Sequence, residues 1–186
     1  MKPKIPGFAI LAAAFLAVSA GAADKGANVP QGDDAVAKSV RHEILLYPYY
    51  SIWDDISFRV SAGQVELSGA VNQPFKKSDI ERIVQKVPGV AGVTDQIRIL
   101  PLSNFDDRLR LQVARAIYSD SVFIQYRNLA VPPIHIIVDN GHVTLTGIVG
   151  NDLEKQVAGM RAGSAGLGFG NVVNNLQVEH PSAKKS

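Results

Sequence analysis

The stretch VSAGQVELSGAV at residues 60–71 returns as VDNGHVTLTGIV at residues 138–149. Both copies follow the frame V-x-x-G-x-V-x-L-x-G-x-V and lie 78 residues apart. A repeat this long has the size of a small domain, whereas the units of solenoid proteins repeat every ~20 to 50 residues. The chain of 186 residues therefore predicts two related domains in tandem.

The repeated frame itself predicts a β-hairpin, because apolar and polar residues alternate on both sides of a short turn. The turn contains Gly63 in the first copy and Gly141 in the second, and glycine supplies the positive φ that a tight hairpin turn requires. Gly69 and Gly147 fall midway along the apolar face of the following strand. A glycine there lets another backbone approach closely or permits a bulge, and we expect each of the two to seat a packed helix.

Helices are expected on both sides of each hairpin. Apolar residues recur at helical spacing behind paired acidic residues at 33–34 and again at 106–107. A second helical stripe follows each hairpin, and a final strand closes each repeat at residues 93–99 and 172–178. Three strands cannot bury an apolar face alone. The predicted fold is therefore α+β, with two tandem α-β-β-α-β modules, each a three-stranded sheet packed against two helices.

The N-terminal residues have the pattern of a cleavable secretory signal. Lys2 and Lys4 precede an apolar run, and small residues lead to Ala22. The run is shorter than the ~20 residues of a spanning helix, which argues against the alternative of an uncleaved membrane anchor. We expect a signal peptide at residues 1–22 and a periplasmic mature protein. The remaining boundaries are expected at 23–32 for a flexible leader, 33–101 and 104–179 for the two domains, and 180–186 for a polar tail.

Charge and composition exclude several classes of function. Residues 1–22 contain two lysines and no acidic residue, so the rest of the chain has 17 basic and 17 acidic residues. A neutral chain argues against nucleic-acid binding, which depends on a basic surface. The absence of cysteine excludes disulfides, thiolate zinc sites and cysteine nucleophiles. A GxxG within residues 163–170 resembles a phosphate-binding loop, but no Gly-Lys-Ser/Thr follows it, so we expect no nucleotide site.

No catalytic, metal or cofactor site is expected. The four histidines are spread along the chain, and only His135 and His142, with Asp139, fall on one hairpin. Their spacing places the two histidines on opposite faces, whereas a metal or acid/base site needs converging side chains, so we interpret the histidines as surface residues. Asp95 and Asn174 occupy matching positions in the final strands, where we expect them to bond to a turn or a helix end.

Aromatic residues gather between the first helix and first strand of each repeat. Two interpretations remain open. Rings with a polar edge suit a lipid headgroup boundary or a protein partner, and they also suit the end of a small core. The candidates for lipid or partner binding are Tyr47, Tyr49, Tyr50 and Trp53 in the first repeat, and Phe123 and Tyr126 in the second.

The element order, the G-x-V-x-L-x-G-x-V hairpin and the G-V-x-x-V turn at residues 89–93 resemble the BON domain family, in tandem. The resemblance covers residues 33–101 and 104–179, although the second repeat lacks the G-V-x-x-V turn. It implies a non-catalytic envelope module, similar to osmotically inducible periplasmic proteins, that binds membrane phospholipid or an envelope protein and supports envelope integrity or stress tolerance. The alternative is a structural or chaperone-like protein–protein interaction protein in the periplasm, without lipid affinity.

Overall fold

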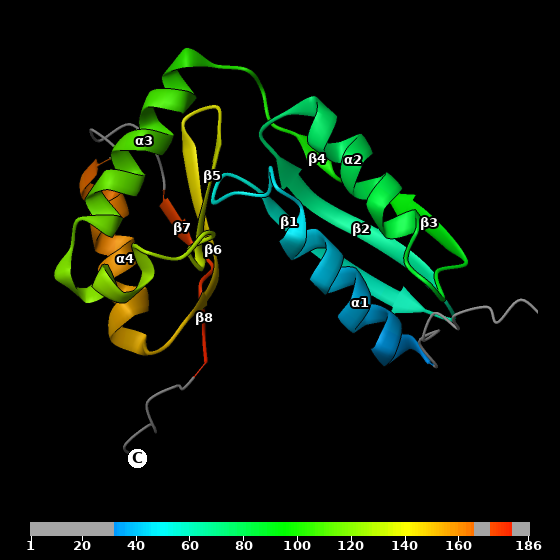
Figure 1. Ribbon diagram of the computed structural model, residues 1–186. Helices are drawn as coiled ribbons and strands as arrows, with labels where there is room; N and C mark the ends of the chain where they lie inside the picture. The colour runs from blue at the N-terminus through cyan, green and yellow to red at the C-terminus, as the bar shows by residue number, and fades with distance from the viewer. Residues whose placement is uncertain (1–31, 166–171, 180–186) are drawn as a thin grey trace, which may run out of the picture.

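The computed structural model describes residues 32–165 and 172–179, and these form two modules with the same order of elements (Figure 1). The expected signal peptide, the leader up to residue 31, most of the glycine-rich segment and the polar tail lie outside the described residues. The first module comprises α1 (Asp33–Leu46), β1 (Asp55–Ser61), β2 (Gln64–Val71), α2 (Pro74–Gln85), β3 (Gly92–Asp95) and β4 (Arg98–Ile99). The second comprises α3 (Asn104–Tyr118), the 3-10 helix η1 (Ser121–Tyr126), β5 (Ile134–Asp139), β6 (His142–Val149), α4 (Asp152–Ala165), β7 (Val172–Asn174) and β8 (Gln177–Val178).

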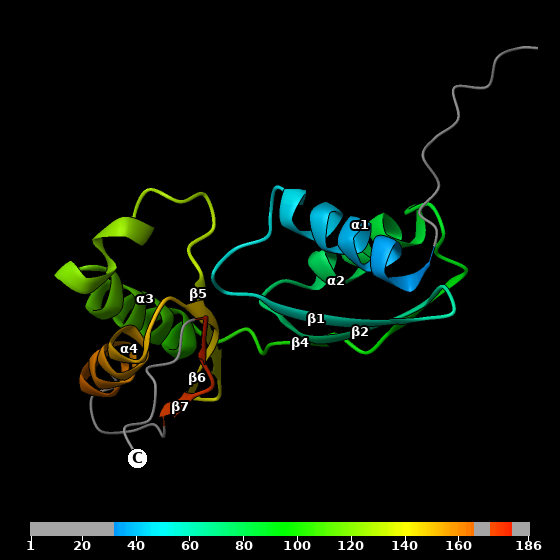
Figure 2. The same ribbon diagram turned by 90° about the horizontal axis from the view of Figure 1, so that it is seen from below.

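Each module is a small mixed sheet with two helices on one face (Figure 2). β1 pairs with β2 antiparallel, and β3 and β4 both run parallel to β2. β5, β6, β7 and β8 repeat this arrangement. The α+β prediction is confirmed, with the third strand of each sheet divided into two short pieces.

The break in the third strand is held by the two polar residues at matching positions. The Asp95 carboxylate accepts the N–H of Ile97 at 2.8 Å. In the second module the side chain of Asn174 accepts the N–H of Leu176 at 3.3 Å and donates to the carbonyl of Lys155 in α4 at 2.7 Å. The expected bonding of Asp95 and Asn174 to a turn or a helix end is thereby confirmed.

Both hairpins turn through two residues in the left-handed region. The φ angles are 50° at Ala62 and 75° at Gly63, and 51° and 81° at the matching residues 140 and 141. Positive φ at both central residues is the geometry of a type I′ turn, which matches the twist of paired strands. The Asp33 carboxylate accepts both N–H groups of the first turn, at 2.8 and 3.0 Å. Asp106 accepts both N–H groups of the second turn, at 3.0 and 2.8 Å. The first turn of each leading helix therefore clamps its hairpin.

The role expected for Gly69 and Gly147 needs a correction. Both have φ of 111°, and a side chain on either would overlap with backbone. That backbone is the carbonyl group of Asp55 at the start of β1 for Gly69, and of Pro133 just before β5 for Gly147. The expectation of a packed helix at these positions is wrong, because the neighbouring strand of the same sheet occupies the space.

Each module has its own apolar core between its sheet and its helices, and the repeated frame supplies the centre of both. Among the described residues, the first core contains Val36, Val40, Ile44, Tyr47, Val65, Leu67, Val71, Ile80, Val84, Val87 and Ile97. The second contains Leu109, Val113, Ile117, Phe123, Ile134, Ile136, Val138, Val143, Leu145, Val149, Val157, Ala158, Ala162 and Leu176.

Candidate functional site

Two of the aromatic candidates are core residues. Tyr47 is 7% exposed, and its hydroxyl donates to the Asp79 carboxylate at 2.7 Å. Burial, together with that hydrogen bond, raises the pKa of Tyr47. Phe123 is 0% exposed and stacks on Tyr126 with 6.4 Å between ring centroids. An outward-facing role does not fit Tyr47 or Phe123, because neither ring reaches the surface.

Tyr126 is half-buried and belongs to a hydrogen-bonded cluster. Its hydroxyl donates to the Glu154 carboxylate at 2.7 Å. Glu154 also accepts the Gly150 N–H at 2.8 Å and the Gln125 side chain at 3.0 Å. Burial, followed by the bond to Glu154, raises the pKa of the Tyr126 hydroxyl. The hydroxyl of Tyr126 therefore links η1 to the start of α4.

Tyr49 does reach the surface, where it belongs to an apolar patch that sequence proximity alone does not reveal. Its ring packs edge-on against Phe75 from α2, with 5.5 Å between centroids. The last two residues of α1 are exposed leucines beside this loop. We call this group the apolar patch; its members, between 46% and 62% exposed, are Leu45, Leu46, Tyr49 and Phe75. Phe75 could have been suspected from its position directly after Pro74, where the first turn of a helix is open to solvent.

The remaining two candidates lie where the two modules meet. Ile52 and Trp53 pack against the core of the second module. The Ile52 carbonyl accepts the N–H of Ile136 at 2.7 Å, so this loop of the first module pairs with the outer edge of β5. The ring of Tyr50 contacts the ring of His135 at 5.4 Å between centroids. Tyr50 and Trp53 are thus partly covered by the junction between modules.

His135 extends the junction and corrects the expectation of a surface histidine. Its Nδ1 lies 2.6 Å from the carbonyl oxygen of Asp54. A carbonyl oxygen only accepts, so Nδ1 carries a hydrogen. Burial lowers the pKa of His135, against the opposing effect of that carbonyl and of the nearby carboxylates of Asp55 and Asp54.

Because His135 is held neutral at the junction of the two modules, we expect the folded protein to lose stability in mild acid. Because the folded chain holds His135 neutral, unfolding takes up a proton below the ordinary pKa of about 6.5. The contribution of His135 is therefore present above about pH 6.5 and is lost as the pH falls. Melting temperatures measured from about pH 7.5 to about pH 5.5 should fall more steeply for the wild type than for His135→Asn, which keeps an N–H donor but does not titrate. Equal slopes for the two proteins would contradict this assignment.

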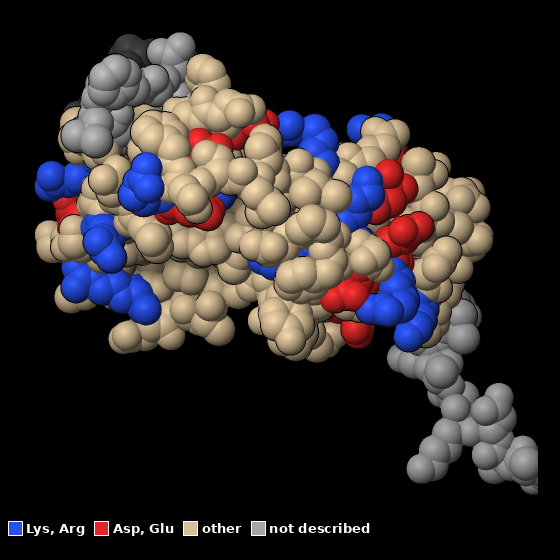
Figure 3. Space-filling view, turned by 90° about the horizontal axis from the view of Figure 1, so that it is seen from above, with Lys and Arg blue, Asp and Glu red and all other residues tan. Residues whose placement is uncertain are grey.

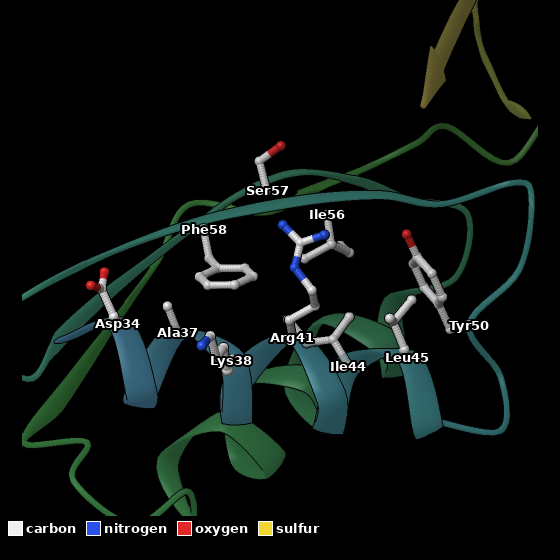
Figure 4. A pocket seen from close by; sticks show the side chains of 10 residues that line it. All are labelled: Asp34, Ala37, Lys38, Arg41, Ile44, Leu45, Tyr50, Ile56, Ser57 and Phe58. Atoms are coloured by element: carbon white, nitrogen blue, oxygen red, sulfur yellow. The ribbon is translucent and has the colours of Figure 1, made fainter. Parts of the chain in front are cut away.

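The first module also has an open groove between α1 and β1, with a volume of about 650 Å³ (Figure 4). Phe58 and Ile56 extend from β1 toward the helix, and Arg41 extends from α1 toward the strand. Lys38 and Tyr50 also line the groove. Its lining combines aromatic and aliphatic groups with two cations, Lys38 and Arg41, and one carboxylate, Asp34. The excess of cations suits an apolar chain that carries negative charge.

The described residues contain no candidate metal site, and the face drawn in Figure 3 is not predominantly basic. No group of three or more His, Asp or Glu side chains within residues 32–165 and 172–179 could hold a metal ion. On the face shown in Figure 3, acidic and basic side chains are interspersed over both modules. None of the helices in the described part of the chain has the length and apolar character needed to cross a membrane.

Two solved structures of CdsD, a structural protein of the type III secretion system of Chlamydia trachomatis, are similar at low level. One is 16% identical with a TM-score of 0.28, and covers 80% of this chain and 93% of that one. The C-terminal domain of CdsD is 16% identical with a TM-score of 0.27, and covers 77% of this chain and 96% of that one. These similarities are too low to support a conclusion on function.

No curated protein matches the chain. The family model of the BON domain, in contrast, matches twice, at residues 32–101 and 106–180, which span both described modules and their repeated hairpins. The chain belongs to the BON domain family, a family of non-catalytic binding domains, and carries two copies in tandem.

Proposed function

We propose that this protein is an exported, non-catalytic binding protein that attaches to phospholipid at the cell envelope through the apolar patch. The observation that carries the proposal is the contact of the exposed rings of Tyr49 and Phe75 beside the exposed end of α1. An amphipathic phenol beside a phenyl ring and two leucines suits the boundary between headgroups and acyl chains. Family membership supports association with a membrane or a protein, and the basic, apolar N-terminus supports export to the periplasm.

The charge balance determines which kind of membrane attachment is expected. Beyond residue 22 the chain has equal numbers of acidic and basic residues. Attraction to anionic headgroups requires an excess of Lys and Arg at the surface. Insertion of apolar side chains does not depend on charge and is screened little by salt. Attachment through the apolar patch should therefore persist in moderate salt and on vesicles of neutral lipid.

A vesicle assay tests the patch. Residues 23–186 should co-sediment with vesicles of phosphatidylglycerol and also with vesicles of phosphatidylcholine. The double substitution Tyr49→Ser and Phe75→Ser should lower the partition at least about tenfold, because burial of each large apolar side chain contributes about 1.5–3 kcal/mol. Loss of this interaction should leave the far-UV dichroism unchanged, since both side chains are exposed.

Leu102→Ser provides the matched control. Leu102 is the most exposed of the large apolar residues in the described part of the chain, and it lies in the connection between the modules and is not a member of the patch. Its substitution should leave the partition unchanged. Absence of binding to either vesicle, or equal binding of the double variant and the wild type, would show that the patch does not attach the protein to lipid.

A further inference from the structure

The outer strands of the two sheets differ in how their free edges are satisfied. In an antiparallel pair, backbone groups point alternately to the partner strand and away from it. In the second module three of these outward-pointing groups, one each on residues 134, 136 and 138, have hydrogen-bond partners. Tyr118 donates its hydroxyl to the carbonyl of Ile134 at 2.7 Å, and Arg110 donates to the carbonyl of Val138 at 2.6 Å. Between them, the N–H of Ile136 donates to the loop that carries Ile52. The edge of β5 is therefore covered at each of these three residues.

The matching edge in the first module is open. The equivalents of residues 134, 136 and 138 are Ile56, Phe58 and Val60, which lie 78 positions earlier. Within the described part of the chain, no group hydrogen-bonds to the outward-pointing backbone of these three residues. The residues of the second module are each 0% exposed, whereas the three on β1 are all partly exposed.

The difference between the two edges follows from two positions at which the first helices of the modules have different residues. Asp33 and Asp106 perform the same turn-clamping role, so the two helices can be aligned through them. Arg110 then corresponds to Ala37, and Tyr118 corresponds to Leu45. Neither Ala37 nor Leu45 has a side chain that donates a hydrogen bond, and both line the groove beside β1. The groove lies at the place where the second module has the side chains of Arg110 and Tyr118.

The second module also shows what such an edge accepts. The segment seated on β5 comes from residues 51–55, with sequence SIWDD. Its contacts with the second module are the backbone carbonyl of Ile52 and the apolar side chains of Ile52 and Trp53. The acidic residues that follow lie in the first module, where the Asp54 carboxylate bonds to Lys76. The groove beside β1 offers complementary groups. Phe58 and Ile56 provide apolar surface, and the exposed cations Lys38 and Arg41 form no ion pair with any described residue (Figure 4).

We infer that the groove between α1 and β1 binds an extended segment of a partner polypeptide, which adds to β1 as a further strand. The segment has an apolar–aromatic pair followed by acidic residues, as in the loop seated on β5. Main-chain hydrogen bonds to an exposed strand edge, with side-chain pockets beside it, are a general mode of peptide recognition. A lipid acyl chain fills apolar volume but leaves the outward backbone groups of β1 without partners, so a peptide fits the site better.

The test uses a labelled synthetic peptide, YSIWDD, with the sequence of residues 50–55. Fluorescence anisotropy should show saturable binding to residues 23–186. Amide hydrogen exchange should slow at Ile56, Phe58 and Val60 when the peptide is added. The double substitution Ala37→Arg and Leu45→Tyr introduces the hydrogen-bonding residues that the second module has at these positions. It should weaken peptide binding at least about tenfold, with an unchanged melting temperature.

A charge reversal tests the acidic end of the peptide. Arg41→Glu should weaken binding of YSIWDD and favour the peptide YSIWKK. The combined Tyr49→Ser and Phe75→Ser protein should still bind the peptide, because neither side chain lines the groove, which shares only Leu45 with the apolar patch. The inference is overturned if YSIWDD does not bind, or if the Ala37→Arg and Leu45→Tyr protein binds it as well as the wild type. It is also overturned if this double substitution abolishes attachment to vesicles and leaves peptide binding unchanged.

Discussion

Gly69→Ala and Gly147→Ala are each expected to lower the free energy of unfolding of their domain by about 2–6 kcal/mol. Two costs add at both positions. A φ of 111° is unfavourable for any residue with a side chain and costs about 1–3 kcal/mol. The new methyl group also overlaps with the carbonyl of Asp55 or Pro133, and overpacking costs typically about 1–3 kcal/mol. The carbonyls belong to the backbone, so they cannot move aside as a flexible side chain could. Denaturant unfolding followed by circular dichroism measures the loss.

Gly163→Ala is the matched control for these two substitutions. Gly163 lies in α4, its φ is not in the left-handed region, and a methyl group there meets no atom within 4 Å. Alanine in place of glycine in a helix stabilises by roughly 0.5–1 kcal/mol. The control should therefore be neutral or slightly more stable. If Gly69→Ala unfolds at the same denaturant concentration as the wild type, the close approach of β1 to Gly69 is not present in solution.

The contrast between the expected and observed roles of Gly69 shows which features of the fold could be predicted from the sequence. Alternation and turn chemistry are local, so the hairpin around Gly63 could be predicted from a dozen residues. A glycine on the apolar face likewise indicated a close backbone contact. Which backbone makes that contact depends on how β1 enters the sheet next to Asp55, and this is set by tertiary structure.

The aromatic segment shows the same limit for the candidate site. Tyr47, Tyr49, Tyr50 and Trp53 are close in sequence, and their proximity predicted a shared role. The chain has no regular structure between α1 and β1, so the directions of the four rings follow no period. Tyr47 enters the core, Tyr49 contacts a ring from α2, and Trp53 docks on the second module. The contact of Phe75 with Tyr49 and the open groove could not be predicted, because both depend on segments that only the fold brings together.

A buried ion pair at the junction carries the second large expected effect. The Nζ of Lys76 lies 2.7 Å from Oδ2 of Asp54, and their side chains are 6% and 0% exposed. The same carboxylate accepts the N–H and the hydroxyl of Ser51, at 3.0 and 2.8 Å, and the N–H of Asn72 at 3.1 Å. Asp54 therefore shapes the loop that presents Ile52 and Trp53 to the second module, and Lys76 neutralises it.

Lys76→Met should destabilise the protein by about 3–5 kcal/mol, because it leaves a buried carboxylate without its cation. The loop should also loosen. Trp53 is the only tryptophan and packs on the second core, so its fluorescence should shift to longer wavelength before the sheets unfold. Chemical denaturation measures the first effect, and the emission spectrum in buffer measures the second.

The second repeat provides a comparison for the effect of leaving a buried charge unpaired. Glu154 lies 78 positions after Lys76 and is equally buried. Its carboxylate accepts hydrogen bonds from the hydroxyl of Tyr126 and from neutral N–H donors in place of a cation. Glu154→Gln should therefore cost only about 1–2 kcal/mol, the size of weakened hydrogen bonds. Asp54→Asn combined with Lys76→Met should be more stable than Lys76→Met alone, because no unpaired charge remains buried. If the combined protein is the less stable of the two, Asp54 acts mainly through its hydrogen bonds to the loop, and the ion pair is secondary to them.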